Sequence, residues 1–147
     1  MPKLRTMADM PAGEWLGFVE AAAFLAWARL LVWIVPLKFW RGQIADGVEA
    51  KGELPPLTER ERAAVLVVSR SVARAVRNAP VALICLPQAL AARWMLRRRG
   101  VATQLYLGTR QAAEEDREFH AWLKAGRTWI TGHCNETEYV TFTRKPA

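Results

Sequence analysis

The hydrophobic periodicity of the chain changes at Gly100, and this change constrains the fold more than any other feature of the sequence. Before Gly100 the apolar residues recur at helical spacing. After it they alternate, so that Leu105 and Leu107 fall on one face of a strand. Helices followed by short strands indicate an α+β protein with a small antiparallel sheet. A chain of 147 residues, 52% of them apolar, can form one domain with a substantial core.

The first predicted helix covers residues 14–35 and ends before Pro36, which cannot continue a helix. Residues 15–35 are apolar on nearly all faces and rich in Trp and Phe, so a membrane must be considered. Glu20 and Arg29 interrupt this stretch, and a charge near the middle of a membrane span costs about 2.5–3.5 kcal/mol. We therefore expect a cytoplasmic protein whose first helix contacts its own core, a partner or a membrane surface.

A loop is predicted at residues 42–56, where glycines, charges and a pair of prolines occur together. It divides the chain into an N-terminal helical arm and loop, residues 1–56, and a core, residues 57–147. The core opens with a second helix, because Thr58 and Glu61 have the spacing of a capping box. This helix is predicted to end just before residue 80.

A third helix and four strands complete the expected fold. The helix begins around Cys85 and closes at residues 97–100, where three arginines precede a glycine. The polar stretch 111–118 predicts a loop, and a tight turn at 125–126 joins two strands. The predicted strands cover residues 102–108, 119–124, 127–131 and 139–143.

The charge of the chain favours anionic partners but does not identify one class of them. Its 21 Lys and Arg residues and 14 acidic residues give a net charge of +7, which favours nucleic acid, lipid headgroups or an acidic peptide. Because the sequence has no zinc finger, RNA-binding aromatic motif or glycine-rich phosphate loop, no nucleic-acid partner is expected. The two cysteines do not form a disulfide framework, and His133 with Cys134 cannot complete a zinc site. We expect no metal and no cofactor.

Cys85 and His120 are the candidate chemical groups. Cys85 is predicted at a helix N-terminus, where unpaired amides and the helix dipole stabilise a thiolate. His120 is one of two histidines and opens a predicted strand. Such an imidazole can take the thiol proton and return it to a leaving amine, as in papain-like and transglutaminase-like enzymes. The alternatives are a small buried cysteine and a hydrogen-bonded structural histidine at a sheet edge.

Several segments together resemble the leader-peptidase family of lasso-peptide biosynthesis, the protease half of the so-called B protein. They are Cys85-Leu-Pro-Gln-Ala-Leu-Ala-Ala-Arg-Trp-Met-Leu-Arg-Arg-Arg-Gly-Val101, Leu107-Gly-Thr-Arg110, Phe119-His-Ala-Trp-Leu123 and Gly126-Arg127. The resemblance covers residues 71–139, and the apolar helix with its exit at Pro36-Leu-Lys-Phe-Trp-Arg41 also resembles the family's N-terminal region. It implies a transglutaminase-like or papain-like core and cysteine-protease activity.

The resemblance also implies a Cys-His-Asp triad, with Cys85 at the nucleophile position and His120 at the base position. Counting along the strand after the histidine places Thr131 where the family has its aspartate. A hydroxyl there would orient the imidazole but stabilise its cation less than a carboxylate would. Asn135 is an alternative third member, and a dyad without a third residue also stays open.

Two further side chains are candidates for contact with substrate. Gln88 lies one helical turn after Cys85, so its amide could approach the substrate carbonyl, although the Cys85 backbone amide is the better oxyanion donor. Trp122 should point to the same side of its strand as His120 and could form a wall of the site. Their ordinary alternatives are a polar first-turn residue and a core tryptophan.

The family resemblance implies three partners: a precursor peptide as substrate, a small leader-binding protein of the RiPP recognition type, and an asparagine-synthetase-like macrocyclase. Two other functions stay open at this point. One is a non-catalytic, membrane-associated helical interaction module in which Cys85 is inert. The other is an acyltransferase on the same core, which would transfer the acyl group to an amine instead of water.

Overall fold

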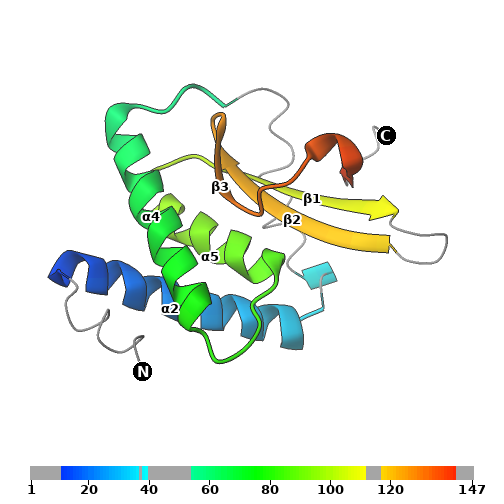
Figure 1. The fold of residues 1–147 in the computed structure, drawn as a ribbon, viewed down its shortest axis with the longest axis horizontal. Helices are drawn as coiled ribbons and strands as arrows, with labels where there is room; N and C mark the ends of the chain where they lie inside the picture. The colour runs from blue at the N-terminus through cyan, green and yellow to red at the C-terminus, as the bar shows by residue number, and fades with distance from the viewer. Residues whose placement is uncertain (1–10, 37, 40–53, 112–116, 142–147) are drawn as a thin grey trace.

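The computed structural model describes residues 11–36, 38–39, 54–111 and 117–141. Within these residues the helices α2 (Ala12–Ile34), α4 (Glu59–Asn78) and α5 (Cys85–Arg98) precede the sheet. The sheet contains β1 (Gln104–Gln111), β2 (Arg117–Ala125), β3 (Thr128–Thr131) and β4 (Val140–Thr141), with the short 3-10 helix η1 (Glu136–Glu138) before β4. Figure 1 shows the helices gathered beside the sheet. The predicted α+β fold is confirmed.

The helix boundaries follow from the signals in the sequence. The capping box at the start of α4 is formed, with the Thr58 amide donating to the Glu61 carboxylate over 2.7 Å. The helix α5 begins at Cys85 and ends before Gly100, whose φ of 73° suits a glycine. Of the predicted loop at residues 42–56, all but the last three residues lie outside the described part of the chain, as does the end of the predicted last strand.

The four strands are antiparallel and lie in the order β3-β2-β1-β4. The predicted loop 111–118 is too long, since β1 continues to Gln111 and β2 already begins at Arg117. Arg110 and Glu118 face each other across the two strands and form an ion pair, so their charges support the strand ends.

One hydrophobic core joins the helices to the sheet. The helix α2 contributes Ala21, Leu25 and Ala28, which pack in the same cluster as side chains of α4, α5 and the strands. The sequence boundary at residues 56/57 therefore does not separate two cores. Among the described residues, α2 is also the one helix that is long and apolar enough to cross a membrane, a property it shares with core helices of soluble proteins.

The two faces of the sheet have different surroundings, and this sets the place of the candidate site. Side chains of the core cluster, such as Leu105, Leu107 and Leu123, point toward the helices. The opposite face carries the residues that alternate with them, including His120 and Trp122. Residues that follow β3 cover this second face, as the contacts of Trp122 with Glu136 and Tyr139 show.

Candidate active site

Cys85 is the first residue of α5, and its half-buried side chain packs against the core cluster. The preceding residue, Ile84, is the N-cap and offers no side-chain acceptor to the amides of the first turn. These amides and the helix dipole are therefore directed at the region around the Cys85 sulfur. Such an uncapped helix end can stabilise an oxyanion that forms beside the thiol.

The Gln88 side chain holds the chain segment that leads into α5. Its amide nitrogen donates to the carbonyl oxygen of Leu83 over 2.7 Å. This bond fixes the approach to Cys85, so in this conformation the amide is occupied by the protein itself. The structure thus gives Gln88 a contact that positions the chain before Cys85, and its contact with substrate stays a prediction.

The His120 imidazole is oriented by a main-chain oxygen. Its Nε2 lies 2.8 Å from the carbonyl oxygen of Gly132. Because a carbonyl can only accept, Nε2 carries the proton of this bond, and in the neutral imidazole Nδ1 is then the basic nitrogen. The ring is thereby fixed in a tautomer that leaves one nitrogen ready to take a proton.

Gly132 is the residue that the sequence did not identify. The sequence predicts that Thr131 orients the imidazole, but Thr131 pairs with Leu123 on the helix-facing side of the sheet, and no residue that the structure describes forms a hydrogen bond with its buried hydroxyl. Asn135, the alternative, accepts from Thr137 at the start of η1. The contact to the imidazole comes from the backbone of Gly132, one position after Thr131, and a catalytic role for Thr131 or Asn135 stays a prediction.

Trp122 is fully buried and packs beside His120, so it is a core tryptophan, and its contact with substrate stays a prediction. The centroids of the Trp122 and His120 rings are 6.0 Å apart, and the Tyr139 ring lies 5.4 Å from the imidazole and 5.7 Å from the indole, so the three rings form one triangular cluster. Gly108 lies opposite His120 in β1, where a Cβ atom would come within 3.1 Å of Trp122 and Tyr139. A glycine inside a strand indicates this kind of close approach, and that signal had been available in the sequence.

Three polar contacts tie the segment after β3 to the sheet. The Trp122 indole donates to Glu136 over 2.9 Å, and Lys124 donates to the same carboxylate over 2.8 Å. Arg110 donates to Glu138 over 2.8 Å. These contacts hold the chain around Gly132 in place, and with it the acceptor of the His120 hydrogen bond.

A family model described as the transglutaminase-like superfamily matches residues 21–144. The chain belongs to the transglutaminase-like superfamily. The matched region begins within α2 and extends past β4, so it includes both Cys85 and His120. This superfamily includes cysteine proteases as well as transglutaminases. Comparison with curated proteins and with solved structures gives no match.

In this transglutaminase-like domain the helix that carries Cys85 packs against the strand that carries His120. No hydrogen bond within residues 11–36, 38–39, 54–111 and 117–141 joins the Cys85 thiol to the His120 imidazole. The two groups lie on neighbouring elements but on different sides of the sheet. Cys85 packs with the core cluster on the helix side, whereas His120 belongs to the opposite face, so the described contacts do not bring the thiol and the imidazole together.

Cys134, the second thiol of the transglutaminase-like domain, is a poor nucleophile. Its side chain is half-buried, and burial together with the negative charge of Glu136 raises the pKa of the Cys134 thiol. A thiol that stays protonated attacks slowly. Within the part of the chain that the structure describes, no three His, Cys, Asp or Glu side chains are grouped so that they could hold a metal ion.

Glu136→Gln is expected to change how the free energy of unfolding of the transglutaminase-like domain depends on pH. Partial burial acts to raise the pKa of the Glu136 carboxyl, but hydrogen bonds from Lys124 and Trp122 outweigh it and lower the pKa below that of an ordinary glutamate. The stabilisation is therefore present at neutral pH and is lost as the pH falls through this lowered pKa. We expect the variant to lose up to about 1 kcal/mol of unfolding free energy at neutral pH, since the pair is partly exposed.

Urea unfolding of the wild type and the variant at neutral and at acidic pH measures this effect. In acid the Glu136 carboxyl of the wild type is protonated and therefore uncharged, like the glutamine of the variant. The two proteins should then unfold at nearly the same urea concentration. A difference between them that stays constant with pH would contradict the role assigned to the charge.

Proposed function

We propose that this protein is a cysteine protease that removes the leader peptide from a lasso-peptide precursor, with Cys85 as nucleophile and His120 as base. The observation that carries the proposal is the hydrogen bond from His120 to the Gly132 carbonyl, because it leaves Nδ1 as the basic nitrogen. Membership of a superfamily that includes cysteine proteases supports it, as does the uncapped helix end at Cys85.

The proposed reaction begins when Nδ1 of His120 takes the proton of the Cys85 thiol. The thiolate attacks the carbonyl carbon of the scissile peptide bond, and a C–S bond forms while the carbonyl becomes an oxyanion near the first-turn amides of α5. Collapse of this intermediate breaks the C–N bond, and the departing amine takes the proton from the imidazolium. Water, deprotonated by His120, then cleaves the thioester and releases a carboxylate and the free thiol.

The first step requires the thiol and Nδ1 to come within hydrogen-bond distance of each other. Because His120 lies on the sheet face opposite the helices, this step requires a rearrangement that brings the imidazole and the Cys85 thiol to the same side. The hydrogen bond to Gly132 suits the imidazolium as well as the neutral ring, because Nε2 donates in both. A neutral carbonyl stabilises the positive ring less than a carboxylate would, so this site would have a weaker base-orienting group than an Asp-containing triad.

The substrate and the partners come from the resemblance of the segments around Cys85 and His120 to lasso-peptide leader peptidases. The proposed substrate is a precursor peptide delivered by a separate leader-binding protein. Cleavage gives the core peptide a free amino terminus, which the asparagine-synthetase-like macrocyclase needs for ring closure. The proposed reactions would take place in the cytoplasm.

Incubation of the protein with a lasso precursor, with and without the leader-binding protein, tests the proposal by mass spectrometry. We expect two fragments whose summed mass exceeds that of the precursor by one water, formed faster when the leader-binding protein is present. Equal rates with and without that protein would contradict the proposed partner. An intact precursor in both reactions would contradict the protease, and a fragment carrying an amine in place of water would indicate an acyltransferase.

A further inference from the structure

The helix α2 exposes a continuous apolar surface on the side that faces away from the core. Trp33 is 81% exposed and Trp27 is 57% exposed, although both are large and apolar. The exposed strip, as we call this surface, consists of Leu16, Val19, Trp27, Leu30, Trp33 and Ile34. Contiguous apolar surface of this kind marks a binding site for a partner or a membrane.

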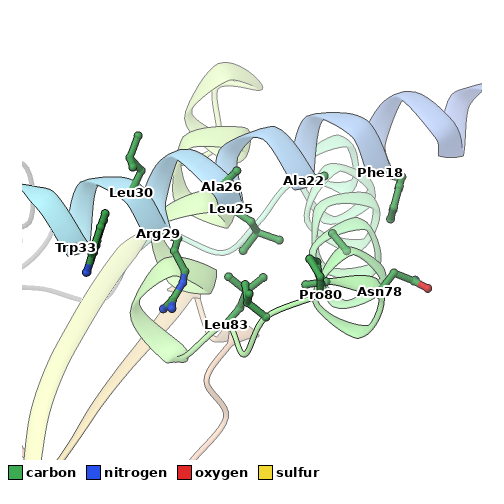
Figure 2. Close-up of a pocket in the computed structure, with 13 residues that line it drawn as sticks. Phe18, Ala22, Leu25, Ala26, Arg29, Leu30, Trp33, Asn78, Pro80 and Leu83 are labelled. Atoms are coloured by element: carbon green, nitrogen blue, oxygen red, sulfur yellow. The ribbon is translucent and has the colours of Figure 1, made fainter.

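Helical geometry places the exposed strip opposite the buried face of α2. At about 100° per residue, positions 16, 27, 30 and 34 project to one side, while Ala21, Leu25 and Ala28 project to the other. Figure 2 shows Leu25 directed toward the connection between α4 and α5, and Leu30 directed away from it. The helix is therefore apolar on two opposite faces, and within the described part of the chain the protein covers one of them.

An apolar groove continues from the exposed strip toward the connection between α4 and α5. It has a volume of about 520 Å³, and Leu30 and Trp33 belong both to its lining and to the strip. Leu83 and Pro80 line the opposite side, and Arg29 points into the groove from α2 (Figure 2). Apolar walls beside a cation suit a molecule that has a hydrocarbon part and an anionic group.

The charges beside the exposed strip are positive. The carboxylate of Glu20 is neutralised by Arg98 at 3.0 Å and Arg99 at 2.6 Å, and Glu14 is paired with Arg74 of α4 at 2.7 Å. Both acidic side chains of α2 are thus compensated from other helices. Arg29, on the opposite flank of the helix from Glu20, forms no ion pair within the described residues.

We propose that α2 docks the protein on the surface of an anionic lipid membrane, with the exposed strip in the acyl region and the flanking arginines at the headgroups. Three tryptophans, Trp15, Trp27 and Trp33, are spread along the helix on this side, and tryptophan is enriched at membrane–water interfaces. An apolar face with cations on both flanks is the pattern of helices that lie in the interface plane. The net charge of +7 attracts the whole protein to anionic lipid.

The helix lies on the membrane and does not cross it. Its 23 residues would suffice to span a bilayer, for which about 20 are needed. Spanning would remove Ala21, Leu25 and Ala28 from the core, and it would place Glu20 with its arginines inside the hydrocarbon. Docking in the plane uses only the face that the protein leaves uncovered. A second copy of the chain fits this face less well, because two molecules of charge +7 repel each other.

Cosedimentation with lipid vesicles tests the proposal on the full chain. Vesicles of dioleoylphosphatidylglycerol and dioleoylphosphatidylcholine in equal parts should bind the protein about tenfold more strongly than vesicles of phosphatidylcholine alone, and added salt should weaken binding. Trp33→Glu should reduce binding to the anionic vesicles about tenfold. Leu66→Glu, on the exposed side of α4, is the matched control and should bind as the wild type does.

Arg29→Ala provides a second variant that leaves the apolar face intact, and it should bind anionic vesicles more weakly while binding to neutral vesicles stays the same. Circular dichroism verifies that each variant is folded.

Equal binding of the wild type to both vesicle types, or binding to neither, would overturn the proposal. A lipid-free dimer that Trp33→Glu dissociates, without vesicle binding by the wild type, would assign the face to a second copy instead. Because the strip contains no residue of the proposed protease site, precursor cleavage in solution is tested separately.

Discussion

Cys85→Ala is expected to reduce kcat/KM for precursor cleavage by at least about a thousandfold, because loss of the nucleophile leaves only binding and oxyanion stabilisation. Alanine fits at the first position of α5, so the helix and the core around it should stay intact. Mass spectrometry of the precursor against time gives the rate. His120→Ala should have an effect of similar size, and the double variant should be no slower than either single one, because the two groups act as a unit.

Cys134→Ala is the matched control for this experiment. Its thiol is half-buried like that of Cys85, but it lies in the segment after β3 and its raised pKa makes it a poor nucleophile. The control variant should cleave at the wild-type rate. If Cys134→Ala lost cleavage and Cys85→Ala retained it, Cys134 would be the nucleophile and our assignment of Cys85 would be wrong.

Gly132→Ala is expected to lower the free energy of unfolding by about 3 kcal/mol, the largest stability effect of a single methyl group that we predict. The φ angle of Gly132 is 70°, which disfavours residues with a Cβ. In addition, an added Cβ would lie 2.3 Å from the carbonyl oxygen of Ala121, so the backbone must shift. That shift would also displace the acceptor of the His120 hydrogen bond and slow any reaction that uses this imidazole.

Gly100→Ala separates the effect of the positive φ angle from the effect of the close contact with the added Cβ. Gly100 has a similar φ of 73°, but the space around its missing Cβ is open. Its substitution should therefore cost only the conformational part, about 1 kcal/mol. Thermal or urea unfolding of both variants measures the difference. Equal losses for the two glycines would show that the close approach at Gly132 contributes nothing.

The helices could be predicted well because their signals are local. Thr58 and Glu61 lie three residues apart, and the Arg-rich end of α5 is followed by Gly100, so each boundary depends on neighbours in sequence. The ends of β1 and β2 were harder to predict. The pairing of Arg110 with Glu118 turns a polar stretch into strand, and that pairing exists only across the hairpin.

In the candidate site, too, the features that depend on local sequence could be predicted, and the contact that depends on the fold could not. The placing of Cys85 at a helix start followed from the helical pattern, as did the placing of His120 on a strand. The partner of the imidazole could not be found in this way, because residue patterns report side chains and the acceptor is a backbone oxygen. Thr131 was the natural expectation from counting, yet strand alternation directs its hydroxyl to the helix side.

A main-chain acceptor at the imidazole has a consequence for how such enzymes are recognised. Every residue type carries a carbonyl oxygen, so replacing side chains one at a time deletes no atom of the group that orients His120. A search for a missing aspartate would not detect it, and an alanine survey would reveal it only at Gly132, where the added Cβ forces the backbone to shift. The feature that must be kept here is the backbone conformation, and the sequence shows it only as a glycine, Gly132, which has no side chain to suggest a function.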